Sequence, residues 1–138
     1  MFVGYRNQPE ATAAALQGGW YRTGDAGFRD KEDGLLYIVD RVKDMIVSGG
    51  ENVYSSEVEQ ALQKHPAVAM SAVVGAPDED LGQRIVAFIV GDASPNALVE
   101  YVAQQLSVHK RPREVRIVES LPRNAMGKVL KKELAQWV

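Results

Sequence analysis

The sequence predicts an α+β fold: a small mixed or antiparallel three-stranded sheet packed with helices and preceded by a β-hairpin. Three observations support this prediction. Two stretches, residues 55–66 and 94–106, repeat apolar side chains at helical spacing. Two apolar runs, residues 67–74 and 84–90, are typical of buried strands. Near the N-terminus the polar turn 30–34 separates two β-like stretches, 20–28 and 35–39, which indicates a hairpin.

The first forty residues are expected to contain little more than this hairpin and one short helix. In the helical stretch, Asn7 is a candidate cap and Pro9 suits an early helical position. After the hairpin, a short strand over 44–47 ends at Gly49 and Gly50. That pair favours a tight turn or a close backbone approach to a ligand. These residues are too few to bury a core of their own, so they are expected to be part of another domain.

From about residue 52 the pattern is that of strands with helices packed on them. Ser56 and Glu59 match a capping box at the start of the first helix. Ser94 is the candidate cap of the second helix, with Pro95 at its first position. A short strand is expected over 115–118. A last helix is expected to begin at Lys128.

Composition excludes several classes of function. The chain has 138 residues, a usual size for one domain, and a net charge of −2, which gives no sign of a nucleic-acid-binding face. It has no cysteine and two histidines, so disulfides and thiolate sites are excluded and no metal site is expected. No apolar run approaches the ~20 residues of a transmembrane helix. The N-terminus has no signal-peptide pattern, and a cytoplasmic location is therefore expected.

Lys128, followed by Lys131 and Lys132, poses an electrostatic question. A cation at the positive end of a helix dipole costs roughly 0.3–1 kcal/mol. An anionic ligand would explain the lysine, because helix N-termini bind phosphates and carboxylates. The alternative is a solvated basic surface. The stretch is no Walker A loop, since Pro122 and Val129 stand where that motif requires glycine and Ser or Thr.

Three other stretches are candidates for binding. Asp25 in "YRTGD" could accept hydrogen bonds from a diol such as ribose, or could bond its own backbone in a turn. Arg41 and Lys43 precede the diglycine, in what could also be a charged edge strand with an ordinary turn. "HKRPR", residues 109–113, suits a phosphate-rich ligand or is a solvated loop.

The order "YRTGD", "DRVKDMIVSGGENVYSSEVE", "HKRPR", "LPRNAMGKVLKKEL" resembles the C-terminal part of the adenylate-forming acyl-CoA synthetases. That superfamily also includes nonribosomal-peptide adenylation domains and firefly luciferase, and the resemblance covers essentially the whole chain. It implies two half-reactions. A carboxylic acid attacks the α-phosphorus of Mg-ATP and gives acyl-AMP and pyrophosphate. The thiol of CoA then takes the acyl group and releases AMP, after the C-terminal domain has rotated about a hinge.

The resemblance also implies roles for individual residues. The nucleotide would be bound by Asp25, through the ribose hydroxyls, and by Arg41. Lys43 falls at the hinge, where many relatives have aspartate and some have lysine. Gly49 and Gly50 would line the pantetheine tunnel in the thioester-forming state. Lys128 would bridge the carboxylate and AMP oxygens during adenylation.

The CoA nucleotide would be held by His109, Arg111 and Arg113, one by stacking and two through phosphates. Two residues differ from those of relatives, and they affect the predicted contact with the CoA adenine more than the contacts with the CoA phosphates. His109 replaces an aromatic residue, and Leu81 falls where some members have a tryptophan. The basic stretch favours free CoA as the thiol, because a carrier-bound arm has no 3′-phosphate nucleotide.

The resemblance assigns residues 1–41 to the tail of the large AMP-binding domain and 42–138 to the mobile C-terminal domain. The family's ATP-phosphate loop, its aromatic-Thr-Glu motif and its acyl pocket lie upstream and have no counterpart in this sequence. Met1 is thus expected to be an engineered boundary, the end of a proteolytic product or the start of a truncated reading frame. The chain is expected to be inactive, or nearly so, without the large domain. Two alternatives are an adenylation module that loads a carrier protein and a non-catalytic partner-binding domain.

Overall fold

The structure is a computed structural model that describes residues 2–138. Its helices are α1 (Pro9–Ala15), α2 (Ser55–Gln63), α3 (Pro95–Ala103) and α4 (Lys131–Leu134), with 3-10 turns η1 (Val42–Asp44) and η2 (Val108–Lys110). Its strands are β1 (Leu16–Gln17), β2 (Trp20–Tyr21), β3 (Asp25–Arg29), β4 (Leu36–Arg41), β5 (Met45–Ser48), β6 (Glu51–Tyr54), β7 (Val68–Asp78), β8 (Gly82–Gly91) and β9 (Glu114–Ile117).

The main sheet has five strands in the order β6-β5-β8-β7, and β9 pairs with β8. β9 runs parallel to β8, and the other pairs are antiparallel. The predicted α+β class, the mixed sheet and the preceding hairpin are confirmed. The expected three strands become five because the turn at Gly49 and Gly50 folds β6 back onto β5 and adds a hairpin to the sheet.

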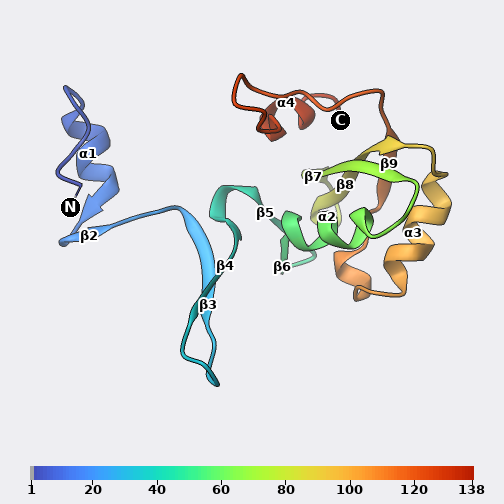
Figure 1. The fold of residues 1–138 in the computed structure, drawn as a ribbon, viewed down its shortest axis with the longest axis horizontal. Helices are drawn as coiled ribbons and strands as arrows, with labels where there is room; N and C mark the ends of the chain where they lie inside the picture. The colour runs from blue at the N-terminus through green and yellow to red at the C-terminus, as the bar shows by residue number, and fades with distance from the viewer. Residues whose placement is uncertain (1) are drawn as a thin grey trace.

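Both faces of the sheet are buried (Figure 1). Along β8, Ile85, Ala87 and Ile89 face the core that α2 and α3 cover, while Val86 and Phe88 face the core beneath α4. This alternation is what the period of two along a strand requires. The sheet therefore separates α2 and α3 from α4, and both helical layers are fixed to one rigid platform.

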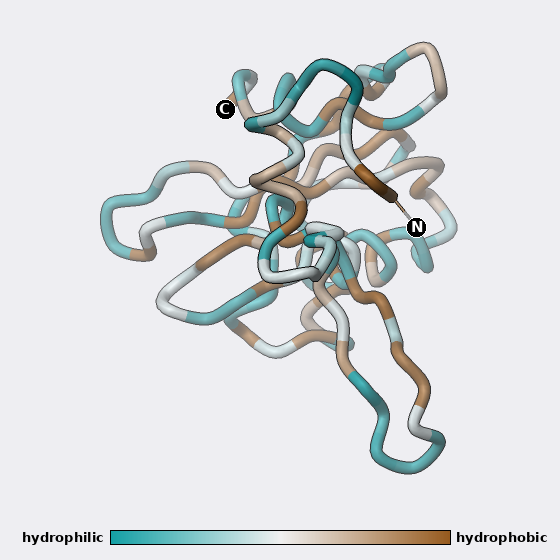
Figure 2. The backbone as a smooth tube through the Cα atoms, turned by 90° about the vertical axis from the view of Figure 1, so that its left-hand side faces the viewer, coloured by the Kyte–Doolittle hydropathy of each residue, from teal (hydrophilic) through white to brown (hydrophobic). Residues whose placement is uncertain are grey.

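The described residues before β5 contribute nothing to this core. No residue of α1 is buried. The β3–β4 hairpin projects from the rest of the molecule, with one mainly hydrophobic arm, β4, and a hydrophilic tip (Figure 2). The expected strand over 20–28 is divided in two, because Gly24 takes a positive φ of 75° between β2 and β3. The exposed apolar side chains of β4, such as Leu36 at 71% and Ile38 at 60%, lack a covering layer here.

The predicted helix caps are confirmed at one helix and wrong at two. Ser94 caps α3 by accepting a hydrogen bond from the backbone N–H of Ala97 at 3.2 Å. Gln8, not Asn7, is the N-cap of α1, and Asn7 has a φ of 55°. The capping box of α2 does not form. The Ser56 hydroxyl donates instead to the carbonyl of Val39, and Glu59 accepts from the backbone of β7.

Leu62 tests which part of the chain supplies the stability. It is fully buried between α2 and the sheet, so Leu62→Ala should lower the free energy of unfolding by about 2–5 kcal/mol. The matched control Leu36→Ala, on the exposed hairpin, should change it by less than about 0.5 kcal/mol. Urea unfolding of the 138-residue chain measures both. Equal losses would show that the hairpin is part of the folded core.

Candidate functional site

Asp25 and Arg41 form an ion pair at the base of the hairpin. They lie opposite each other in the register of β3 and β4, and Arg41 Nη1 lies 2.6 Å from Asp25 Oδ1. The same nitrogen donates to the carbonyl of Thr23 at 2.7 Å. Both side chains are partly exposed, and such pairs contribute only ~0–1 kcal/mol to stability. The structure thus brings together the two residues predicted to bind the nucleotide, with carboxylate lone pairs left to accept further donors.

Lys128 lies on a tight loop, not at a helix N-terminus. The bridge between Arg123 and Val129 closes the loop, and Gly127 turns it with a φ of 80°. Asn124 Oδ1 accepts from the backbone N–H groups of Met126 at 3.0 Å and Lys128 at 2.9 Å. The predicted helix start at Lys128 is therefore wrong, because α4 begins only at Lys131.

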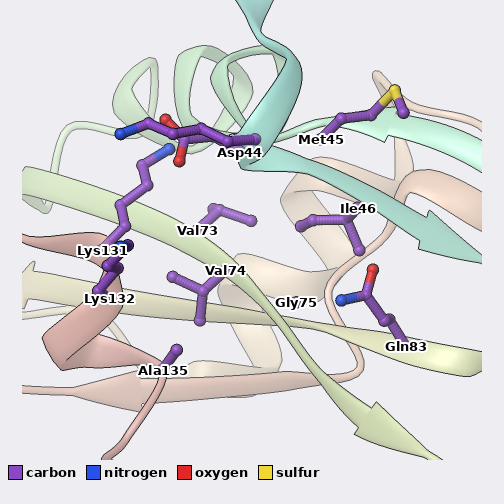
Figure 3. Close-up of a pocket in the computed structure, with 11 residues that line it drawn as sticks. Asp44, Met45, Ile46, Val73, Val74, Gly75, Gln83, Lys131, Lys132 and Ala135 are labelled. Carbon is purple, nitrogen blue, oxygen red and sulfur yellow. The ribbon is translucent and has the colours of Figure 1, made fainter. Parts of the chain in front are cut away.

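The loop holds Lys128 in an ordered, exposed position. Among the described residues, no carboxylate pairs with its ammonium group. A groove of about 520 Å³ separates the loop from η1 and is lined by Lys43, Asp44, Asn124 and Lys128, among others. The predicted hinge residue and the predicted catalytic lysine thus border the same groove. A smaller adjoining hollow, of about 150 Å³, is shown in Figure 3.

Gly49 and Gly50 form the two-residue turn between β5 and β6. Their φ angles of 59° and 81° are both left-handed, which suits the type I′ turn that such hairpins favour. A Cβ at Gly50 would meet no atom within 4 Å, whereas one at Gly49 would lie 3.5 Å from Leu81 Cδ2. The backbone geometry of the turn therefore favours glycine at both positions, whether or not a ligand binds there. The turn also leaves open space above Gly50.

The basic stretch 109–113 divides into bound and exposed side chains. Arg111 donates from Nε to the carbonyl of Leu106 and from Nη2 to that of Ala103, each at 3.1 Å. Ala103 is the last residue of α3 and Leu106 lies three residues beyond it, so Arg111 satisfies one terminal carbonyl of the helix and one carbonyl of the turn that follows. His109 and Arg113 are exposed. Sequence reasoning missed these contacts, because Arg111 lies eight residues beyond the end of α3 and no local pattern links the two.

Asp40 is a further residue that sequence reasoning missed. Partial burial would raise the pKa of its carboxyl. The backbone N–H groups of Ser56 and Arg41, the Ser55 hydroxyl and the charge of Lys131 together lower that pKa below its ordinary value. Asp40 lies 15 and 16 residues from its serine partners, so no local sequence signal pointed to these contacts.

The described part of the chain offers no metal centre. No group of three or more His, Cys, Asp or Glu residues within 2–138 is arranged to hold a metal ion. None of the helices in this part has the length and apolar character that a bilayer crossing requires.

The sequence matches a protein-family model over residues 57–128, and that family is described as the AMP-binding enzyme C-terminal domain. The chain belongs to this family. Among curated relatives of this AMP-binding enzyme domain, a 2-succinylbenzoate–CoA ligase of Bacillus cereus is 44% identical over 98% of the chain. The long-chain-fatty-acid–CoA ligase FadD13 of Mycobacterium tuberculosis is 47% identical over 96%. The chain spans 28% and 27% of the lengths of these relatives.

Solved structures of several proteins contain the same fold. ATP-bound MatB from Rhodopseudomonas palustris is 37% identical and matches 99% of the chain with a TM-score of 0.90, over 28% of that protein. The o-succinylbenzoate CoA synthetase of Bacillus subtilis, in complex with its acyl-adenylate intermediate, is 41% identical with a TM-score of 0.89, over 96% of this chain and 28% of that one. A fatty acyl CoA synthetase of M. tuberculosis is 46% identical with a TM-score of 0.74, over 98% and 27%.

The lowered pKa of Asp40 predicts a pH dependence of stability. A carboxyl with a depressed folded-state pKa contributes stability that is present above its unfolded value, about 3.9, and is lost as pH falls through the folded value. Asp40→Asn should therefore lower the melting temperature at about pH 6, and this loss should shrink toward about pH 2.5. Thermal unfolding across this range measures the effect. A loss that is constant with pH would contradict the assigned ionised role.

Proposed function

We propose that this chain is the hinge-bearing C-terminal part of an AMP-forming acid–thiol ligase, an acyl-CoA synthetase. The reaction would join a carboxylic acid to CoA through an acyl-adenylate, with ATP cleaved to AMP and pyrophosphate. Residues 1–41 would belong to the large domain and 42–138 to the mobile domain. The large domain would supply the ATP-phosphate loop and the acyl pocket, so the chain alone would be inactive. A cytoplasmic location would suit the use of ATP and CoA.

One observation carries this proposal: the predicted functional residues of the mobile domain lie at opposite ends of one short strand. Lys43, beside the Lys128 groove, precedes β5, and Gly49 and Gly50 follow it. The four strand residues between these points span roughly 13 Å. A rigid sheet that carries two different chemical groups at two ends can serve two half-reactions by rotating about one hinge.

In the first half-reaction, Lys128 would act as an electrostatic stabiliser. The carboxylate nucleophile is already ionised at neutral pH, so no general base is required. Negative charge gathers where the carboxylate approaches the α-phosphate, and an ammonium group there lowers the barrier. An exposed lysine on a loop fixed by Asn124 can reach such a site without breaking an ion pair of its own.

Asp25 and Arg41 would orient the nucleotide. The Asp25 carboxylate can accept from both ribose hydroxyls while it keeps one contact with Arg41. The Arg41 guanidinium would in turn lie near the AMP moiety. The weak surface ion pair between them would be retained or exchanged for nucleotide contacts at little cost.

In the second half-reaction, the turn at Gly49 and Gly50 would line the path of the pantetheine arm. The open space above Gly50 fits a chain that must pass close to the backbone. His109 and Arg113 are the exposed groups suited to the CoA nucleotide, by stacking and by phosphate contact. Arg111 could contribute through its unused N–H groups, since its fork has five donors and two are bound to the carbonyls of Ala103 and Leu106.

Mg²⁺ would arrive with ATP. The described residues include no cluster of metal ligands, so none of them is assigned to the ion. No step is assigned to the metal through this chain.

Lys128→Ala and Gly49→Asn should impair opposite half-reactions in the full-length parent. Lys128→Ala should lower pyrophosphate release from acid and ATP by roughly 100-fold or more, and should spare thioester formation from supplied acyl-adenylate and CoA. Gly49→Asn should do the reverse. Asn-Gly is a favoured type I′ pair, so the turn would persist while a side chain narrows the thiol path.

The two variants control for each other, and each outcome decides between hypotheses. Survival of both half-reactions in Lys128→Ala would contradict the ligase proposal and favour a non-catalytic binding domain. Loss of both in a folded Lys128→Ala variant would contradict the division between the two ends of β5. Transfer to a carrier-bound phosphopantetheine but not to CoA would favour the carrier-loading alternative.

A further inference from the structure

A network of partly buried polar side chains joins β4, α2 and α4. Asp40, near the end of β4, accepts through Oδ2 from the Ser55 hydroxyl and from the backbone N–H of Ser56, each at 2.9 Å. The Ser56 hydroxyl donates back to the carbonyl of Val39 at 2.8 Å. The start of α2 is therefore capped by a strand that precedes it by fifteen residues, and not by its own N-cap Tyr54, which makes no side-chain bond.

Lys131 extends this network to α4. Its ammonium group lies 2.6 Å from Ser55 Oγ and 2.8 Å from Glu59 Oε1. The same Glu59 oxygen accepts from the backbone N–H of Val73 at 2.8 Å. The Lys131–Glu59 pair is less exposed, at 22% and 19%, than the pair of Lys110 and Glu57, at 26% and 35%. Solvent therefore screens it less, and its geometry is held from two helices and a strand.

The hinge divides this network. Asp40 precedes Lys43, whereas Ser55, Glu59 and Lys131 all follow it. A rotation about the hinge segment must therefore remove Asp40 from the two donors of α2. The backbone N–H of Ser56 would lose its partner at the same time, and water would have to replace it.

Lys131 is also fixed relative to the Lys128 loop. Leu130 donates from its backbone to the carbonyl of Pro122 at 2.8 Å, which closes the base of the loop. Leu134, on the same helical turn, is fully buried beneath the sheet. In Figure 3, Val73 and Val74 of β7 lie between Asp44 of the hinge segment and Ala135 after α4, with Lys131 beside them. A displacement of Lys131 would thus move the base of the loop that carries Lys128.

We propose that Asp40 and Lys131 are positioning residues, which hold the domain in the orientation that presents Lys128 for adenylation and release it for thioester formation. This inference rests on the proposed ligase function. The network caps α2 in one orientation only, so it stabilises that orientation relative to the rotated one. A local cap at residue 54 would have stabilised α2 equally in both.

The first test measures orientation in the 138-residue chain itself, which has no native cysteine. Spin labels attached through Glu32→Cys at the hairpin tip and Gln104→Cys after α3 report the distance between the two parts by pulsed electron resonance. The wild-type background should give one narrow distribution. Asp40→Asn and Lys131→Met should broaden or shift it, while Lys131→Arg and the neighbouring Lys132→Met should not. Distributions that are the same in all variants would overturn the proposal.

The second test separates positioning from simple stabilisation in the full-length parent. With palmitate or 2-succinylbenzoate as the acid, whichever supports pyrophosphate release, Asp40→Asn and Lys131→Met should slow adenylation by roughly tenfold. Thioester formation from the supplied acyl-adenylate should be unchanged or faster. Equal losses in both half-reactions, or no loss in either, would overturn the proposal.

The failure of the proposed function would look different. In that case Lys128→Ala would leave adenylation intact, whatever the Asp40 and Lys131 variants do. Melting temperatures of all variants identify any that fail to fold. If Lys131→Met fails to fold, Lys131→Arg, which keeps the charge, decides whether the cation at position 131 positions the loop. Adenylation at the wild-type rate in Lys131→Arg supports the role. Lost adenylation in a folded Lys131→Arg variant rejects it.

Discussion

The carboxylate of Asp40 is the contact on which the arrangement of this protein depends. It accepts from the backbone of Arg41, from the Ser55 hydroxyl and from the backbone of Ser56. These bonds attach the end of the hairpin to the start of α2, across the segment that carries Lys43. The hairpin has no buried core of its own, so its direction relative to the sheet follows from this junction and the backbone beside it. Charged acceptors make stronger bonds than neutral ones, which suits a junction made by so few groups.

The sheet gives the junction a rigid base. Because β8 is buried on both faces, the loops at its edges move together as one body. The turn at Gly49 and Gly50 and the loop of Lys128 are therefore held at a constant separation. Only a rotation about the hinge can present one of them in place of the other to the large domain. Small residues at the turn and a tightly bonded Asn124 at the loop keep both sites ordered without burying them.

Periodicity predicted the parts of the fold that packing determines, including α2, α3, β7 and β8. It missed β6, where Glu51 and Asn52 are poor strand formers and only Val53 is fully buried. It placed a helix start at Lys128, because residues 128–134 have helical spacing, but the backbone N–H of Leu130 is bonded across the loop instead. The pairing of Asp25 with Arg41 was not predicted, because the expected second strand of the hairpin ended at Val39, two residues short of Arg41. The contacts of Asp40 join residues far apart in sequence, and no local pattern encodes them.

The central claim is that the Lys128 loop meets the adenylate in the complete enzyme. Amine-reactive labelling of the full-length parent, read by mass spectrometry, measures this directly with and without a non-reactive acyl-adenylate analogue. The account predicts that labelling of Lys128 slows by roughly tenfold or more when the analogue is bound, while labelling of the exposed Lys64, just after α2, is unchanged. Equal labelling of Lys128 with and without the analogue would contradict it.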